Sequence, residues 1–190
     1  MFDLSLYNDE FFEWHVKYAR EYSIKTMDWY IEKYKPFSVL DFGCGIGSYL
    51  ESAYNHGLDF MGFEISEAAK KYTPKHLLGA ISYQDCTEPI ITLPADVVLS
   101  FETAEHIEPS GTDQFIRNIT MAVDGHLLFT AAPPGQDGTG HINMHPRQFW
   151  IDQFSKDLNY SEDLTKDISA NWERLGAPKY ICDNLIVCTR

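Results

Sequence analysis

The chain has 190 residues, which suits one domain, and its 44% hydrophobic and 14% aromatic residues can form a substantial core. Its net charge is −13 and its isoelectric point is near 4.8, and no local cluster of lysine and arginine offsets this acidity. These values argue against whole-chain disorder and against a nucleic-acid partner, whose phosphate backbone an acidic protein repels.

The beginning of the chain and its cysteines predict a soluble cytoplasmic protein. The first ten residues contain no basic segment followed by a continuous apolar one, and the apolar runs elsewhere are too short to cross a membrane. The cysteines form no C-x-x-C pair, which disfavours a disulfide framework and a zinc knuckle. We therefore predict free thiols at all four positions, which are Cys44, Cys86, Cys182 and Cys188.

Helical and strand patterns alternate along the first half of the chain. Apolar residues at helical spacing predict one or two helices from about residue 8 to residue 35, ending before Pro36. The later elements are a buried strand over 37–43, a helix over 46–55 that ends before Gly57, a second strand over 58–65, a short helix capped by Ser66 and running toward Tyr72, and a weaker third strand over 79–85.

The second half continues this alternation. It predicts a fourth strand over 95–102, a helix over 112–123 capped by Thr112 or Asp113, a fifth strand over 125–133, a helix from Pro146 to about residue 158, a helical stretch over 162–175 and a closing strand over 183–190. Such alternation predicts one α/β domain with a doubly wound, mostly parallel sheet and an antiparallel C-terminal strand. Within it we predict an N-terminal helical cap at 1–35 and a Rossmann-like core at 36–190.

Acidic residues close the first four predicted strands. In chain order they are Asp41, Glu64, Asp85 and Glu102. Parallel sheets of this kind bind ligands at the carboxyl ends of their strands, so the four carboxylates should rim a single crevice. A phosphate would be repelled there, whereas a cationic ligand would be attracted.

The loop after the first predicted strand has the pattern D-x-G-x-G-x-G, with Gly43, Gly45 and Gly47 at alternate positions. The dinucleotide fingerprint G-x-G-x-x-G would require a third glycine at Ile46 or Ser48, and no Gly-Lys-Ser/Thr sequence follows as in a nucleotide-triphosphate loop. The loop is therefore expected to bring its backbone close to a ligand that is not a phosphate.

The segment VLDFGCGIG resembles the first motif of class I S-adenosylmethionine-dependent methyltransferases, and FMGFEIS, YQDCTE and ADVVLSFETAEHI follow in that family's order. S-adenosylmethionine carries a sulfonium and an ammonium and no phosphate, which suits an acidic rim. The resemblance implies that this molecule is the cofactor, that S-adenosylhomocysteine is the product, and that the methyl group passes to an oxygen or nitrogen of a small-molecule acceptor.

The resemblance also implies roles for single residues. Asp41 would help to hold the methionine ammonium, directly or through water, with Gly43 and Gly45 packed beneath the ligand. Glu64 would accept hydrogen bonds from both ribose hydroxyls, and Asp85 would accept one from the adenine amino group. The remaining residues implied for the cofactor site are Cys44, Ile65, Cys86, Ser100, Phe101 and Glu102.

Three further segments, YNDEFFEWH, SFETAEHIEP and AAPPGQDGTGHINMHPRQFW, resemble a bacterial and viral subset of small-molecule methyltransferases with a G-Q-x-G-T-G-H-x-N loop after the fifth strand. The likeness extends to the final NLIVCTR, but Met144 and His145 depart from the subset's pattern. Because a chain of this size leaves little room for a substrate domain, we expect the acceptor between the N-terminal helices and the loops after strands four and five.

Two histidines are candidate catalytic residues. An acceptor that loses a proton on methylation is helped by a positioned base, and histidine titrates nearest to neutral pH. His106 follows the fourth predicted strand, and His141 lies in the loop after the fifth. Each could instead only tie its own loop by hydrogen bonds. Glu105 could orient His106 or point to solvent.

No metal site is predicted from the sequence. His141 and His145 have a spacing that suits a helix, but Pro146 and the preceding glycines indicate a loop. The carboxylates that could complete a hard-metal site there are Glu102, Glu105 and Asp137.

The aromatic residues of the N-terminal helices have two interpretations, a lid over the substrate or an ordinary core stripe, and we predict the core stripe. They are Phe11, Phe12, Trp14, Tyr18 and Tyr22. Tyr7, Phe11 and His15 are still candidates for acceptor contact. Two other functions stay open, namely a cofactor-binding regulatory module without transfer and a nucleotide-sugar or NAD-linked Rossmann enzyme.

Overall fold

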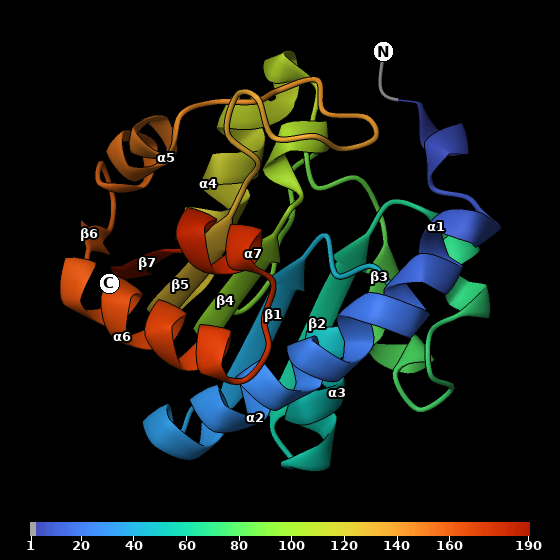
Figure 1. The fold of residues 1–190 in the computed structure, drawn as a ribbon, viewed down its shortest axis with the longest axis horizontal. Helices are drawn as coiled ribbons and strands as arrows, with labels where there is room; N and C mark the ends of the chain where they lie inside the picture. The colour runs from blue at the N-terminus through green and yellow to red at the C-terminus, as the bar shows by residue number, and fades with distance from the viewer. Residues whose placement is uncertain (1–2) are drawn as a thin grey trace.

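The computed structural model describes residues 3–190, and these form a seven-stranded sheet with helices on both faces (Figure 1). The strand order is β3-β2-β1-β4-β5-β7-β6; β1 to β5 are parallel, and β7 and β6 pair antiparallel. The predicted α/β class, with its mostly parallel sheet and antiparallel C-terminal strand, is confirmed. The strands are β1 (Ser38–Phe42), β2 (Asp59–Glu64), β3 (Ile81–Tyr83), β4 (Ala95–Phe101), β5 (Val123–Thr130), β6 (Asn159–Tyr160) and β7 (Ile186–Thr189).

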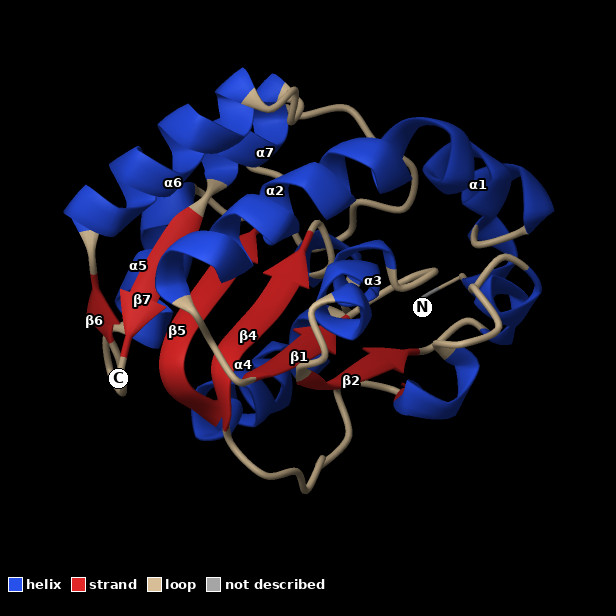
Figure 2. Cartoon of the chain, turned by 90° about the horizontal axis from the view of Figure 1, so that it is seen from below, coloured by secondary structure: helices blue, strands red, loops and turns tan. Residues whose placement is uncertain are grey.

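Two hydrophobic layers hold the helices to the sheet. Figure 2 shows the helices on either side of the strands. Alternate residues of β4 point to opposite faces, so Val98 packs in one layer while Val97 and Leu99 pack in the other. Both faces are apolar because both are covered, as is usual in parallel sheets. One face carries α2 (Arg20–Tyr34), α3 (Ser48–Asn55), α6 (Glu162–Arg174) and α7 (Lys179–Asn184); the other carries α4 (Thr112–Ala122) and α5 (Arg147–Phe154).

The N-terminal helix is continuous but changes its winding. After a 3₁₀ turn (Leu4–Leu6), α1 (Asp9–Trp14) passes into a π-helical segment (His15–Ala19) and then into α2. Lys35 ends α2 in a left-handed conformation, with φ 52°, directly before Pro36 as predicted. π-helical segments are rare and are frequently found at functional sites.

The predicted cap at Ser66 is wrong. The segment Glu67–Lys71 is a 3₁₀ helix without a side-chain cap, and the Ser66 hydroxyl instead donates to the backbone carbonyl of Tyr7 at 3.3 Å. The Ser66 hydroxyl therefore bonds to a residue far away in the sequence and does not cap the helix that follows it.

The predicted cap of α4 is also wrong. A 3₁₀ turn (Pro109–Gly111) precedes the helix, and Gly111 occupies the cap position without a side-chain hydrogen bond. The Thr112 hydroxyl accepts from the Asn143 amide at 2.9 Å. That bond ties the start of α4 to the loop after β5.

β6 and α7 were not predicted, because two residues and six residues are too short to show a period. All four cysteines are free and buried, as expected. Within residues 3–190 no helix combines the length and the apolar character that a membrane crossing requires.

Candidate active site

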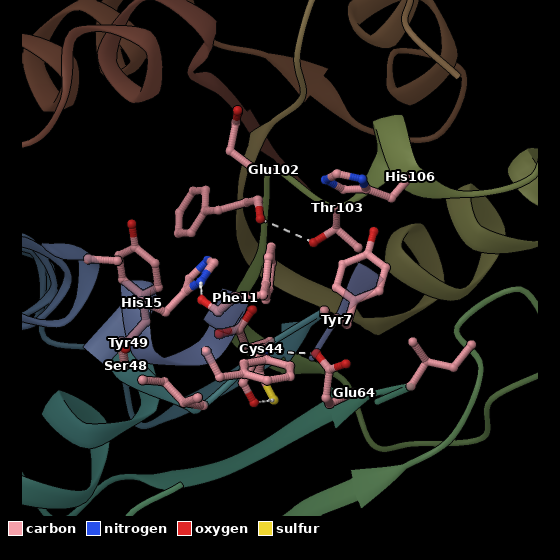
Figure 3. A pocket seen from close by; sticks show the side chains of 18 of the residues that line it. Tyr7, Phe11, His15, Cys44, Ser48, Tyr49, Glu64, Glu102, Thr103 and His106 are labelled. Atoms are coloured by element: carbon pink, nitrogen blue, oxygen red, sulfur yellow. Dashed lines mark hydrogen bonds between the residues drawn. The ribbon is translucent and has the colours of Figure 1, made fainter. Parts of the chain in front are cut away.

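The carboxyl ends of the parallel strands open into one pocket (Figure 3). Asp41 lies one residue before the end of β1, Glu64 ends β2, Asp85 follows β3, and Glu102 directly follows β4. All four carboxylates line this pocket, where the strand order reverses between β1 and β4, so the predicted convergence is present. Among the described residues no lysine or arginine lines it.

The glycines after β1 give the loop a shape that other residues adopt only with strain. Gly43, Gly45 and Gly47 have φ values of 82°, 54° and 80°. The Gly43 and Cys44 N–H groups both donate to the Phe63 carbonyl, at 2.8 and 3.0 Å, which anchors the loop to β2. The loop therefore runs along the floor of the pocket with backbone facing inward.

We expect Gly43→Ala to destabilise the protein more than Gly45→Ala. A Cβ on Gly43 would lie 2.2 Å from the Thr103 hydroxyl oxygen, whereas one on Gly45 meets nothing within 4 Å. Both changes place a side chain at positive φ, which costs about 1–2 kcal/mol, and only Gly43→Ala adds a clash. Thermal unfolding of the two variants measures the difference, and equal melting temperatures would contradict it.

Asp41 and Glu64 are both buried, but their hydrogen bonding differs. Glu64 accepts from the Gly45 N–H at 2.9 Å and from the Ser66 N–H at 2.7 Å. Among the described residues no group donates to the Asp41 carboxyl. Burial and the nearby Glu64 carboxylate raise the pKa of Asp41 to about 8, and burial also raises the pKa of Glu64. A cationic ligand group beside Asp41 would lower its pKa again, because a nearby positive charge favours the charged form of a carboxyl.

The structure brings most other predicted cofactor residues to the same pocket. Asp85 accepts from the N–H and hydroxyl of Thr87, both at 2.7 Å. Ser100 is the exception, because its hydroxyl is fully buried and donates to the Phe42 carbonyl at 2.9 Å. The predicted residues that line the pocket besides the carboxylates are Gly43, Cys44, Gly45, Ile65, Cys86, Phe101 and His106.

The N-terminal aromatic residues are not an ordinary core stripe. Phe12 is buried, but Trp14 and Tyr18 are 47% and 52% exposed, so the core prediction is wrong for these two. Phe11 and His15 line the pocket. The reason is that the first turns of this helix lie over the pocket and not over the sheet. The lining residues that the sequence did not predict include Tyr49, Thr103 and Tyr180.

The two candidate histidines lie together, with ring centroids 5.0 Å apart. His106 lines the pocket, and His141 does not. His106 Nδ1 lies 3.1 Å from the Gly140 carbonyl, and His141 Nδ1 lies 3.3 Å from the Gln136 carbonyl. Because a carbonyl only accepts, both Nδ1 atoms carry the proton and both Nε2 atoms keep a lone pair. Burial lowers the pKa of His106 to about 4.

Glu105 points inward and not to solvent. It is fully buried, and its Oε1 accepts from the Ala132 N–H at 3.1 Å and lies 4.0 Å from His141 Nε2. Burial, followed by the neighbouring Glu102 carboxylate, raises the pKa of Glu105. Glu105 therefore faces His141 in the buried layer behind His106.

The other residues of the loop after β5 lie apart from this cluster. Asp137 is exposed. The His145 ring stacks on Phe149 with centroids 3.8 Å apart, and its Nε2 lies 3.1 Å from the Asn143 side-chain oxygen. The H-x-x-x-H pair therefore does not converge on one point.

Comparison with known proteins identifies the class. The model of the methyltransferase domain family matches residues 16–155. Comparison with curated protein sequences gives no match. Similar solved structures include the sugar N-methyltransferase KedS8 from a Streptoalloteichus species, at TM-score 0.69 and 15% identity over 96% of this chain and 92% of that chain.

Two further similar structures show the same fold. The O-methyltransferase from a trans-AT PKS multienzyme of Brevibacillus brevis, in complex with S-adenosyl-L-homocysteine, has TM-score 0.59 and 19% identity over 87% of this chain and 69% of that chain. A SAM-dependent methyltransferase from Archaeoglobus fulgidus has TM-score 0.61 and 20% identity over 96% of this chain and 100% of that chain.

Fold and pocket thus define a Rossmann-like methyltransferase, with S-adenosylmethionine as the methyl donor. The chain belongs to the methyltransferase domain family. The unpaired Asp41 carboxyl and the open space at Gly45 fit a donor that carries an ammonium group. Family membership favours an enzyme over a regulatory module, and methyl transfer over NAD-linked or nucleotide-sugar chemistry.

Proposed function

We propose that this enzyme transfers the methyl group of S-adenosylmethionine to an oxygen or nitrogen of a small molecule. The observation that carries the proposal is the convergence of Asp41, Glu64 and Asp85 in one pocket that no described lysine or arginine lines. The similarity to an O-methyltransferase and to a sugar N-methyltransferase supports a small-molecule acceptor.

Each acid has a proposed role toward the donor. Asp41 pairs with the ammonium, Glu64 accepts from the ribose hydroxyls, and Asp85, beside the Cys86 N–H, accepts from the adenine amino group. Glu64 keeps acceptor capacity beyond its bonds to the Gly45 and Ser66 N–H groups, because a carboxylate offers about four lone-pair sites. When bound, the donor supplies a methyl group on a positively charged sulfur.

The acceptor is proposed to lie between the N-terminal segment and the loops after β4 and β5. Of the proposed cap at 1–35, residues 3–35 are described, and Tyr7, Phe11 and His15 line this side of the pocket. In Figure 3, Tyr7 lies between Glu64 and His106, which supports an acceptor site bordered by Tyr7. The aromatic walls exclude water and hold the acceptor's apolar surface.

His106 is proposed to act on the acceptor's reacting group. Its Nε2 lone pair can accept a hydrogen bond from an acceptor O–H or N–H and take its proton as the new bond to carbon forms. His141 is proposed to hold the His106 ring in position, because the two rings are in contact. Most of the acceleration comes from holding the reacting atoms in line.

We also propose a cytoplasmic enzyme with neither nucleic acid nor membrane as partner. The net charge of −13 disfavours anionic surfaces. The four unpaired cysteines suit a reducing compartment.

Calorimetry with S-adenosylhomocysteine tests the proposal. We expect a dissociation constant on the order of micromolar, which corresponds to about −8 kcal/mol. An assay of S-adenosylhomocysteine release across a panel of hydroxyl- and amine-bearing small molecules then tests transfer. A folded protein that binds neither donor nor product would contradict the proposed function.

We expect His106→Ala to slow turnover by about 10²-fold. That is the lower end of the range for a general base, because a group whose pKa is near 4 is a weak base. Affinity for S-adenosylhomocysteine should stay unchanged, and His145→Gln, outside the pocket, should keep full turnover. Equal turnover in His106→Ala and the parent enzyme would show that His106 takes no part in the reaction.

A further inference from the structure

Three side chains with metal-ligating atoms meet beside the pocket, which one of them lines. They are Glu105, His106 and His141, and one ligand atom from each lies within 4.8 Å of the other two. Glu105 and His106 lie in a 3₁₀ turn (Ala104–His106) after β4, and His141 comes from the loop after β5. The Glu105 carbonyl accepts from the N–H groups of Ile142 and Asn143, both at 2.9 Å, so backbone bonds hold the two segments together.

Both histidines are oriented as metal ligands are. Their Nδ1–H groups donate to the Gly140 and Gln136 carbonyls, which fixes each ring and leaves each Nε2 with its lone pair. Metal-binding histidines nearly always show this arrangement, in which the second ring nitrogen donates to a carbonyl or a carboxylate. Neither Nε2 atom of His106 or His141 has a hydrogen-bond donor among the described residues.

The carboxylate of the cluster lacks a partner on one oxygen. Glu105 is fully buried; its Oε1 accepts from the Ala132 N–H, and its Oε2 has no hydrogen bond among the described residues. A buried acceptor without a partner is unfavourable, and a bound cation would satisfy it. The cluster thus has two imidazole nitrogens and one carboxylate oxygen that no described group donates to, next to the Glu102 carboxyl.

Glu102 adds a second carboxylate beside the cluster. Its charge acts on both Glu105 and His141, its Oε2 accepts from the Gln136 amide at 2.9 Å, and its Oε1 is buried without a hydrogen bond among the described residues. Glu102 also adopts a left-handed backbone conformation, with φ 48°. Backbone strain of this kind is concentrated at functional sites. In Figure 3, Glu102 and His106 lie on the side of the pocket opposite Glu64.

We propose that Glu105, His106 and His141 bind a divalent first-row transition-metal ion, with the Glu102 carboxyl beside the site as a neighbouring acid and not as a ligand. Imidazole nitrogen with carboxylate oxygen suits manganese, iron, cobalt or zinc better than calcium, which takes oxygen ligands alone. Three protein ligands with an open position are typical of a catalytic metal site and not of a structural one. His106 lines the pocket, so a bound ion would lie next to the proposed acceptor site.

The site deepens the proposed function and rests on it for its role. An acceptor hydroxyl that coordinates the ion is more acidic, so it loses its proton to solvent more readily before its oxygen attacks the methyl group. With the ion bound, His106 is a ligand and the proton passes to solvent, so the base role of His106 proposed above is that of the ion-free enzyme. Removal of the ion with a chelator is then expected to lower turnover without changing affinity for S-adenosylhomocysteine, and unchanged turnover would overturn this role.

Titration of the chelator-treated full chain with Co²⁺, followed by visible absorption and equilibrium dialysis, tests the site itself. We expect about one ion per chain with a ligand-field band that reports nitrogen and oxygen donors. Glu105→Gln and His141→Gln should each weaken Co²⁺ binding by about 10²-fold or more, since changes even outside the ligand shell weaken metal binding by about 10–100-fold. The matched control is His145→Gln, four residues along the same loop, which should keep the parent affinity.

S-adenosylhomocysteine calorimetry on the same samples separates the possible failures. A variant that binds S-adenosylhomocysteine normally is folded, so its loss of Co²⁺ binding reports the metal site. A parent enzyme that binds S-adenosylhomocysteine but not Co²⁺ would overturn the metal site and leave the methyltransferase proposal intact. Equal Co²⁺ affinities in the parent and both cluster variants would also overturn it.

Discussion

Glu64→Gln is expected to weaken S-adenosylhomocysteine binding by about 10²–10⁴-fold. The carboxylate of Glu64 is buried at the end of β2 and is proposed to accept two hydrogen bonds from the ribose. Hydrogen bonds to a charged group contribute about 1.5–3 kcal/mol each, so two of them correspond to this range. The glutamine amide also places an N–H donor where the carboxylate oxygen accepted a hydrogen bond.

Calorimetry measures this loss, and the choice of variants separates binding from folding. Glu64 also accepts from the Gly45 and Ser66 N–H groups, so its replacement lowers the melting temperature of the ligand-free protein as well. Glu67→Gln is the control, because Glu67 lies three residues away and is exposed. A Glu64→Gln protein that is folded and binds like the Glu67→Gln protein would show that Glu64 does not contact the ribose.

Asp41→Asn is expected to stabilise the ligand-free enzyme above pH 8 and to weaken donor binding. The pKa of Asp41 is raised from 3.8 to about 8, so between these pH values the unfolded chain has lost the proton that the folded chain keeps. Stability from this group is therefore complete below about pH 4 and falls as the pH rises toward 8. Asparagine removes this pH-dependent loss of stability, which amounts to about 6 kcal/mol at most, because each pKa unit corresponds to about 1.4 kcal/mol.

The pH dependence of binding has the opposite sign. A cationic ligand binds the charged form of Asp41, so in the parent enzyme its affinity should rise by up to about tenfold per pH unit from pH 6 to pH 8. The Asp41→Asn protein should show a weaker and flatter profile. The neighbouring thiols of Cys44 and Cys86 stay neutral in this window, because burial raises the pKa of both.

Thermal unfolding at pH 6 and pH 8.5 measures the stability of the ligand-free proteins. Calorimetry across the same pH range measures their affinity for the ligand. Asp41→Asn should have the higher melting temperature at pH 8.5, and the gain should shrink toward pH 6. Its binding should also release no proton, whereas the parent should release about one at pH 7. An Asp41→Asn protein that is equally destabilised at both pH values would show that the carboxyl is satisfied in the folded state.

Local patterns were sufficient to predict most of the fold and the donor side of the pocket. The apolar runs of β1, β2 and β4 and the helical spacing between them imply a parallel sheet, and a parallel sheet places all its carboxyl ends at one edge. Asp41, Glu64, Asp85 and Glu102 therefore converge without any knowledge of side-chain contacts. The spacing of Gly43, Gly45 and Gly47 likewise argued against a phosphate-binding loop, because it matches neither known phosphate-loop pattern.

Only the tertiary structure decided the acceptor side. Whether Glu105 faces solvent or His141 depends on the loop after β5, whose Ile142 and Asn143 N–H groups bind the Glu105 carbonyl across more than thirty-five residues of sequence. Ser100 was misplaced because its hydroxyl pairs with the β1 backbone instead of entering the pocket. Spacing along the chain determines which face or edge a residue occupies, whereas the direction and partner of a buried polar side chain depend on segments that are distant in sequence.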